Sequence, residues 1–213
     1  MNRTRFVITL LGVLLVQSQV LAQSSEVPKY EVAAEFTTLE RDAFFETRTE
    51  PGVGGRFTYN LNKVVSFESA AYFFPRTCFS CRDEGNVTEV VGGLKVGKRF
   101  EKWGVFAKGR PGVASFSRGE FNFIAAPGSS DFQLVMKRVN AFAADVGGVV
   151  EFYPSRHIVT RFDAGDTIIH FGRRTFNSLA FNPTTNTTSI SPITTRARTE
   201  HSFQFVASVS FRF

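Results

Sequence analysis

The stretch His201-Ser-Phe-Gln-Phe-Val-Ala-Ser-Val-Ser-Phe-Arg-Phe213 lies at the end of the chain and decides the fold. Every second residue from Phe203 to Phe213 is apolar, and the residues between them are polar apart from Val206. Successive side chains of a β-strand point to opposite faces, so this period of two predicts a strand with one apolar and one polar face. A transmembrane barrel accommodates such a strand, because lipid lies outside it and a polar lumen inside.

The first 22 residues have the organisation of a secretory signal peptide. Met1–Arg5 is short and positively charged, Phe6–Val16 is an apolar run, and Val20-Leu-Ala22 supplies small residues for cleavage after Ala22. The apolar run is shorter than the roughly 20 residues that a membrane-spanning helix needs. We therefore expect residues 1–22 to be a cleaved signal peptide and residues 23–213 to form one domain. An uncleaved membrane anchor is the alternative.

The composition agrees with alternating strands. The chain holds 25 Phe, yet its mean hydropathy is only −0.05. A barrel wall reconciles these two values, because half of each strand is apolar and half is polar. Seven further segments alternate like the terminal one: Tyr30–Phe36, Gly54–Leu61, Val65–Phe73, Val90–Val96, Trp103–Val113, Phe142–Phe152 and Ile158–Ala164.

The connections between these segments alternate in length. Four are long and three are short, which is the pattern of an even-stranded meander with both ends in the periplasm. The sequence therefore predicts an all-β fold, an eight-stranded antiparallel up-and-down transmembrane β-barrel. The long connections span residues 40–51, 75–87, 117–139 and 171–200, and the short ones span 60–63, 98–102 and 154–157.

Three features of the sequence bear on the details of the strands and loops. Phe121–Phe123 and Gln133–Met136 either extend strands five and six as a hairpin around Pro127-Gly128, or form an extra pair that gives ten strands. Pro111 lies inside strand five and cannot donate a backbone hydrogen bond, so we expect a bulge or kink there. The Asn, Thr and Ser residues of 182–195 predict a flexible surface loop.

Alternation also assigns charged residues to the inside of the barrel. An eight-stranded barrel is only wide enough for its own side chains, so unpaired charges there would be costly. Because six acids and six bases face inward, we expect a salt-bridged, packed lumen and no conduction pathway. The twelve residues are Glu31, Glu35, Arg56, Glu68, Lys95, Lys108, Arg110, Asp145, Glu151, Arg161, Asp163 and Arg212.

With its signal peptide, its alternating strands and its terminal Phe213, the chain resembles the OmpA/OmpX-type barrels of Gram-negative bacteria. The segments Gly54–Leu61 and Arg161–Asp166 are similar to the broad outer membrane protein beta-barrel domain family. The resemblance implies a location in the bacterial outer membrane. It also implies that the barrel-assembly machinery recognises the terminal strand through the assembly signal Phe205, Val209, Phe211 and Phe213.

Few residues of the chain suggest a catalytic, redox or metal-binding role. Cys78-Phe-Ser-Cys81 falls in a long loop, and passage through an oxidising compartment favours a disulfide between Cys78 and Cys81 over free thiols or a redox or metal site. His201 and Ser202 are strand neighbours and point to opposite faces, so they cannot form a nucleophile and base on one wall. By the same parity His201 points outward. His170 lies at the rim and His157 in a short turn, so we expect no catalytic, cofactor or metal site.

The long loops are basic, which suits the phosphates of lipopolysaccharide, although ordinary solvated charges explain them equally well.

We expect an outer-membrane barrel with a structural or surface-interaction role. A lipid A-modifying enzyme and a narrow pore are the alternatives. The expected partners are outer-membrane lipid, the assembly machinery and a surface ligand, with no nucleic acid, and the barrel is expected to be a monomer. The basic residues of the long loops are Arg118, Lys137, Arg138, Arg173, Arg174, Arg196 and Arg198.

Overall fold

Ten β-strands form the protein in a computed structural model, which describes residues 27–43, 46–75, 85–125 and 131–213. No helix within these ranges is long and apolar enough to cross a membrane. The strands are β1 (Tyr30–Ala43), β2 (Glu46–Asn60), β3 (Val65–Phe74), β4 (Val87–Arg99), β5 (Trp103–Ala125), β6 (Phe132–Phe152), β7 (Ile158–Phe171), β8 (Arg174–Asn182), β9 (Thr187–Thr195) and β10 (Arg198–Arg212).

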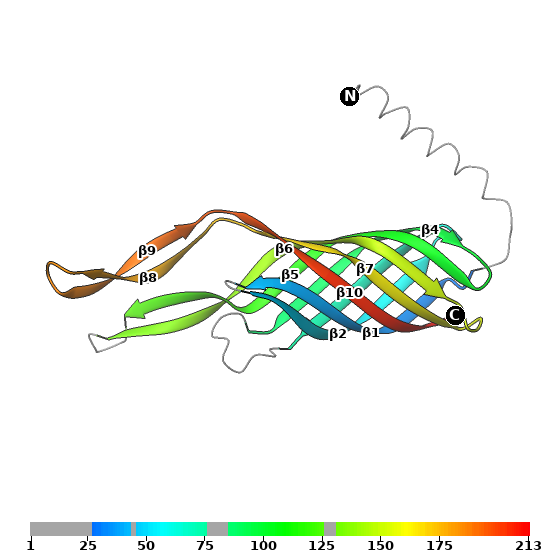
Figure 1. The fold of residues 1–213 in the computed structure, drawn as a ribbon, viewed down its shortest axis with the longest axis horizontal. Helices are drawn as coiled ribbons and strands as arrows, with labels where there is room; N and C mark the ends of the chain where they lie inside the picture. Colours follow the sequence, from blue (N-terminus) through cyan, green and yellow to red (C-terminus); the bar gives the residue numbers. More distant parts are fainter. Residues whose placement is uncertain (1–26, 44–45, 76–84, 126–130) are drawn as a thin grey trace, which may run out of the picture.

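Eight of the strands close into one antiparallel barrel in the spatial order β1-β10-β7-β6-β5-β4-β3-β2 (Figure 1). The terminal strand closes the ring, because β10 pairs with β1 from Glu31↔Arg212 to Leu39↔Gln204. The backbones of Tyr30 and Phe213 also exchange hydrogen bonds of 2.9 and 3.0 Å. The predicted eight-stranded barrel is confirmed. The ten-stranded barrel is wrong, because Phe121–Phe123 and Gln133–Met136 belong to β5 and β6 and add no further pair to the ring.

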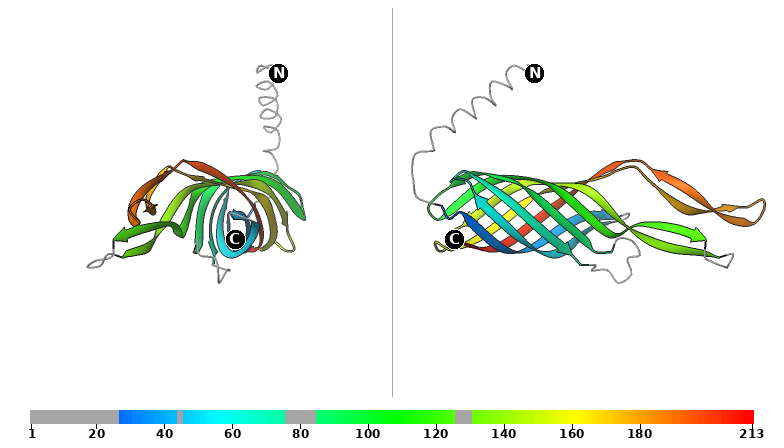
Figure 2. Two further views of the ribbon diagram at one scale, coloured as in Figure 1. Left: turned by 60° about the vertical axis from the view of Figure 1, so that its left-hand side comes forward. Right: turned by 180° about the vertical axis from the view of Figure 1, so that it is seen from behind.

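The two ends of the barrel differ. The turn end holds Phe213 and the short turns at residues 61–64, 100–102 and 153–157. At the opposite end, which we call the hairpin end, β5 and β6 continue to the pair Ala125↔Phe132, and β8–β9 follows β7. Both hairpins project beyond the barrel wall in the same general direction (Figure 2).

Two segments predicted as loops are strands. Within residues 40–51, β1 and β2 stay paired as far as Ala43↔Glu46. Most of 182–195, predicted as a flexible loop, is β9, which pairs with β8 from Arg174↔Thr195 to Asn182↔Thr187. Threonine and isoleucine favour strands, and pairing satisfies backbone groups that a loop would leave to water. The extension of strands five and six as one hairpin is confirmed.

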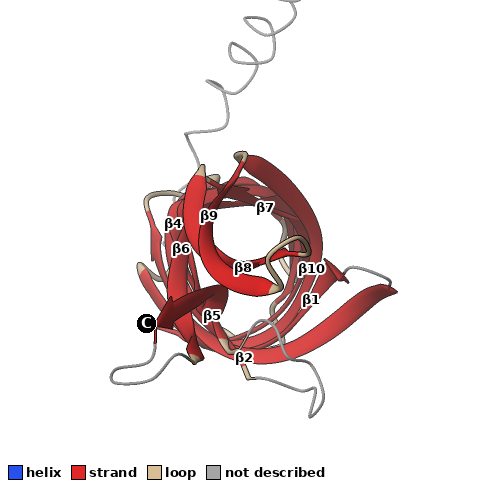
Figure 3. Ribbon diagram, turned by 90° about the vertical axis from the view of Figure 1, so that its left-hand side faces the viewer, coloured by secondary structure: helices blue, strands red, loops and turns tan. Residues whose placement is uncertain are grey.

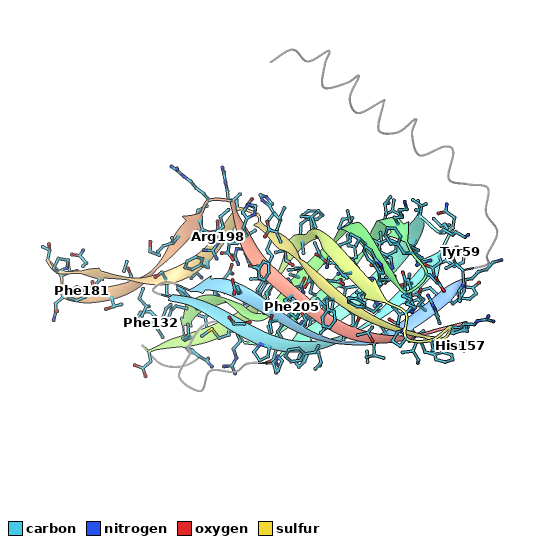
Figure 4. All side chains as sticks on the ribbon, turned by 45° about the vertical axis from the view of Figure 1, so that its right-hand side comes forward. Tyr59, Phe132, His157, Phe181, Arg198 and Phe205 are labelled. Carbon is cyan, nitrogen blue, oxygen red and sulfur yellow. The ribbon has the colours of Figure 1, made fainter. Side chains whose placement is uncertain are left out.

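The outer wall of the barrel is apolar although it is exposed. Phe36, Phe142, Phe203 and Val209 each leave between 50% and 56% of their surface uncovered. A soluble protein rarely exposes a continuous apolar surface of this kind, whereas a membrane barrel presents it to lipid. Aromatic rings gather at the turn end, where Tyr59 is labelled in Figure 4, as expected of an interfacial girdle.

Pro111 lies in β5 without the predicted bulge. It pairs with Ala144 of β6 in an uninterrupted register. On the other side, the pairing with β4 is interrupted between Val91↔Gly112 and Leu94↔Gly109 and resumes in the same register. The backbone nitrogen of Pro111 has no hydrogen to donate, and the gap in the pairing of β5 with β4 accommodates it. The register shift of β5 lies further along the strand, between Phe116 and Glu120.

We expect Gly93→Ala to destabilise the barrel. A Cβ at Gly93 would lie 2.1 Å from the carbonyl oxygen of Gly109, a backbone atom that cannot rotate away. Separating β4 from β5 should lower the free energy of unfolding by about 1–3 kcal/mol, the usual cost of overpacking. Urea unfolding in lipid vesicles, read by heat-modifiable gel migration, measures this change. Gly109→Ala is the control, because nothing lies within 4 Å of its Cβ; equal midpoints for the two variants would contradict the prediction.

Candidate functional site: the filled lumen and the hairpin end

The structure buries all twelve of the charged residues assigned to the lumen. Their relative exposure runs from 0% for Glu68 to 9% for Arg212. They come from all eight barrel strands and converge on one interior, which Figure 3 shows end-on from the hairpin end. A narrow barrel has no room for bulk water beside side chains of this size, so protein groups must solvate the charges.

Arg161 and Glu68 lie at the centre of the lumen. Arg161 of β7 binds Glu68 of β3 with two guanidinium nitrogens, one of them 3.0 Å from Oε2. Its Nε also donates to Asp163 at 2.5 Å. Lys95 of β4 approaches Glu68 to 3.2 Å and contacts Glu151 of β6 as well. These contacts join strands from opposite sides of the barrel through charge-assisted hydrogen bonds.

A second group of ion pairs lies beside the first. Asp145 of β6 accepts hydrogen bonds from Lys108, at 2.8 Å, and from Arg110, both of β5. Lys108 also lies 3.2 Å from Asp163, which links the two groups. Across the barrel, Arg56 of β2 lies 2.7 Å from Glu35 of β1. The ion pairs therefore form one network around the lumen.

Two charged lumen residues were missed by the sequence prediction, and one predicted member takes a different role. Glu89 is 1% exposed, and Arg99 lies 3.7 Å from Glu31. Both lie on β4 beyond the predicted Val90–Val96 segment, and extending the alternation by a few residues would have found them. Arg212 forms no ion pair with the described acids; it donates to the carbonyl oxygen of Arg156 at 2.7 Å and lies over the Tyr153 ring.

An apolar layer fills the lumen at the hairpin end, and the sequence analysis did not predict it. Its members lie where β1, β3, β4, β5, β6 and β7 reach that end, and Phe116 and Phe171 contact each other at 5.2 Å between ring centroids. Tyr72 marks the boundary, because its hydroxyl accepts a hydrogen bond from Arg110 at 3.1 Å. The layer includes Leu39, Phe74, Val87, Phe116, Val139, Ile169 and Phe171, all at most 7% exposed.

The two hairpins beyond this layer contact each other. The rings of Phe121 in β5 and Phe176 in β8 meet edge to face at 5.0 Å. The backbone N–H of Asn177 donates to the side chain of Asn122 at 2.9 Å. Residues 175–195 contain no charged side chain. Phe181, near the far end of this hairpin in Figure 4, is 61% exposed.

The histidines lie outside the lumen. His201 is exposed, as its parity predicted, and its Nδ1 lies 2.6 Å from the Asp166 carboxylate. His170 Nδ1 lies 3.0 Å from the Thr199 hydroxyl. Ser202 is 3% exposed and belongs to the opposite face. Cys78 and Cys81, with the predicted disulfide, lie outside the described residues, as does the predicted signal peptide.

Solved structures of known proteins have a similar fold. Neisserial surface protein A is similar over 86% of this chain and 97% of that chain, with a TM-score of 0.52 and 11% sequence identity. The chain has the fold of an eight-stranded outer-membrane barrel. The attachment invasion locus protein Ail of Yersinia pestis is similar over 88% of this chain and 100% of that chain, with a TM-score of 0.48 and 11% identity.

OprG of Pseudomonas aeruginosa, another outer-membrane protein, is similar over 88% of this chain and 97% of that chain, with a TM-score of 0.45 and 9% identity. No family model matches this chain. A search of curated proteins finds no match either. At such identities the comparisons establish the fold alone.

We expect Glu68→Gln to destabilise the barrel strongly. The change leaves Arg161 and Lys95 buried without the carboxylate that they share. Breaking a buried ion pair from one side costs about 3–5 kcal/mol, which urea unfolding in lipid vesicles would measure. Glu101→Gln removes an exposed carboxylate from a short turn and serves as the matched control. A loss no larger than the control's would show that the network contributes little.

Proposed function

We propose that the protein is an integral barrel of the bacterial outer membrane with a structural and surface-interaction role, carried by its hairpin end. The observation that carries this proposal is a contrast between two regions. The lumen is filled by ion pairs and an apolar layer, while β5–β6 and β8–β9 extend far beyond the wall. Short turns face the periplasm and long connections face outward in barrels of this kind, so the hairpins lie outside the cell.

The filled lumen argues against a pore. Ions would have to displace paired charges whose separation leaves buried groups uncompensated, and then pass the packed apolar layer. Phe116, Phe171 and Phe74 in that layer are each at most 4% exposed. We therefore assign the barrel itself to anchoring and the external hairpins to interaction with other molecules.

The outer face of the terminal strand supports assembly into the membrane. Phe205, Val209, Phe211 and Phe213 alternate along the wall and are between 37% and 59% exposed. Such a continuous apolar row is available to an assembly factor before insertion and to lipid afterwards. We propose that this row is the signal that the barrel-assembly machinery reads.

A cysteine introduced at Phe181 should react with a membrane-impermeant maleimide on intact cells. The experiment uses a Cys78→Ser/Cys81→Ser background, so that the introduced thiol is the single target. Phe181 lies on the hairpin proposed to be external, and Glu101 lies in a turn proposed to be periplasmic. Phe181→Cys should therefore be labelled before lysis and Glu101→Cys only after it.

The reverse labelling pattern would overturn the proposed orientation, and equal labelling only after lysis would overturn surface exposure. Planar-bilayer recording of the purified protein supplies an independent test of the lumen. Stable single-channel conductance would contradict the role of anchor and favour the narrow pore.

A lipid-modifying enzyme is the second candidate function, and the His201–Asp166 contact is the observation that favours it. A carboxylate can orient a histidine for general-base catalysis. However, the Ser202 side chain lies on the opposite face of the strand from His201, so it cannot serve as the nucleophile beside it. The anchor role therefore agrees better with the geometry.

We expect His201→Asn and His170→Asn to leave the lipid A of the host strain unchanged. The variants remove both outward-facing histidines of the hairpin end and leave the lumen intact. Mass spectrometry of lipid A from cells that express the wild type, each variant or no protein makes the comparison. A lipid species that depends on the wild-type histidines would establish the enzyme in place of the anchor.

A further inference from the structure

Glu89 of β4 lies in the lumen where the ion-pair network ends and the apolar layer begins. The residue is 1% exposed. Tyr72, which marks that boundary, is its partner in the pairing of β3 with β4. Val87 and Val91, two residues away on either side along β4, are buried members of the apolar layer. Water therefore cannot solvate a charge on the Glu89 side chain.

Glu89 differs from the other buried acids of the lumen in its lack of an ion-pair partner. It forms no ion pair with the lysines and arginines in the part of the chain that the structure describes. Each of the other buried lumen acids lies within 4.0 Å of at least one cationic nitrogen. A buried charge without such a partner is strongly unfavourable.

The hydrogen bonds of the Glu89 carboxyl group are also few. Its Oε2 accepts one from Gln204 Nε2 at 3.3 Å, and its Oε1 has no partner among the described residues. Gln204 is itself held in place, since it donates to Thr37 at 3.3 Å and accepts from Thr167 at 2.8 Å. One long hydrogen bond from a neutral amide stabilises a carboxylate less than a bond from a cationic group does.

The charged groups that face Glu89 from neighbouring strands are engaged elsewhere. They are Asp145 of β6 and Lys108 and Arg110 of β5. Both cations donate hydrogen bonds to Asp145. Tyr72, the titratable group that faces Glu89 from β3, accepts a hydrogen bond from Arg110. A negative charge on Asp145 repels a second one on Glu89, so the surroundings favour an uncharged Glu89.

We propose that Glu89 is a proton-binding site, whose carboxyl group is protonated and neutral in the folded barrel. A buried carboxyl group that lacks a cation takes up a proton in preference to remaining ionised. In the neutral form it can lie between Val87 and Val91, whereas loss of the proton would place a charge beside the apolar layer and draw water into it. The proton therefore keeps the hairpin end of the lumen closed. This role is independent of the proposed surface interaction.

The stability of the barrel then depends on pH with a defined sign. A glutamate in an unfolded chain has a pKa of about 4.3 and is ionised at neutral pH. The folded barrel binds one more proton at Glu89 than the unfolded chain does, so the contribution of this residue to stability falls as the pH rises. Glu89→Gln keeps the shape of the side chain, is neutral at every pH and removes this dependence.

Urea unfolding in lipid vesicles, read by heat-modifiable gel migration, tests this sign. At neutral pH Glu89→Gln should unfold at a higher urea concentration than the wild type, the opposite of the result expected for Glu68→Gln. The ratio of the unfolding equilibrium constants of wild type and Glu89→Gln should increase by up to about tenfold per unit of pH, because unfolding releases one proton. For Glu101→Gln, which alters an exposed acid, the same ratio should not change near neutral pH.

Infrared spectroscopy of the purified, folded protein detects the proton directly. The C=O stretching band of a protonated carboxyl group lies at higher frequency than the amide bands and shifts in heavy water. The wild type and Glu101→Gln should show this band at neutral pH, and Glu89→Gln and Glu89→Met should lack it. Glu89→Met serves as the comparison if Glu89→Gln does not fold.

Absence of this band from the wild type, or its persistence in both Glu89 variants, would overturn the proposal. So would a loss of stability in Glu89→Gln as large as that in Glu68→Gln at every pH, because the ionised carboxylate would then be the stabilising form. A small metal cation is the competing ligand. Unfolding that depended on sodium or calcium concentration in the wild type, but not in Glu89→Gln, would replace the proton with that cation.

Discussion

The contact between Arg161 of β7 and Glu68 of β3 spans the lumen, and the interior of the barrel is organised around it. In so narrow a barrel water cannot solvate a buried carboxylate, so the protein must supply the compensating charge. Lys95, Arg56 and Arg110 also lie within 4.0 Å of Glu68. Because these residues come from separate strands, closure of the barrel and completion of the ion-pair network depend on each other.

The lumen changes character along its axis. From the turn end to the middle it contains paired charges, and at the hairpin end it contains packed aromatic and aliphatic side chains. The second layer shields the first from external water, which strengthens electrostatic contacts inside the barrel. A filled lumen also stiffens the wall from which the two hairpins extend. The barrel is therefore suited to hold external strands in place and poorly suited to pass solutes.

The wall and the hairpins of the protein meet different environments. The wall exposes apolar side chains such as Val53 and Phe203 that lipid covers. The β8–β9 hairpin exposes uncharged polar residues with a few apolar ones such as Phe181, and the β5–β6 hairpin also exposes charged residues such as Lys137 and Arg138. The hairpins are joined through Phe121 and Phe176 and through the Asn122–Asn177 hydrogen bond. A ligand at the hairpin end would thus meet two connected β-ribbons that stand on one filled support.

Alternation in the sequence was sufficient to predict the barrel, its strand number and the burial of charges such as Glu68, Lys95 and Arg161. The reason is that a period of two is a local property, and one misplaced residue would turn every side chain to the wrong face. Glu89 and Arg99 lay within reach of the same argument and were missed because the predicted strand was too short.

The ion-pair partners, the apolar layer and the place of β8–β9 required the tertiary structure. Which acid meets which base depends on the stagger between strands that are far apart in sequence, as with Glu68 and Arg161. Phe116 and Phe171 look like any other apolar strand residues until closure of the barrel brings them together inside it. The sequence by itself determined which face of each strand is apolar, because that follows from neighbouring residues. The tertiary structure alone decided what each inward side chain contacts, because most of those contacts join residues of different strands that are far apart in the sequence.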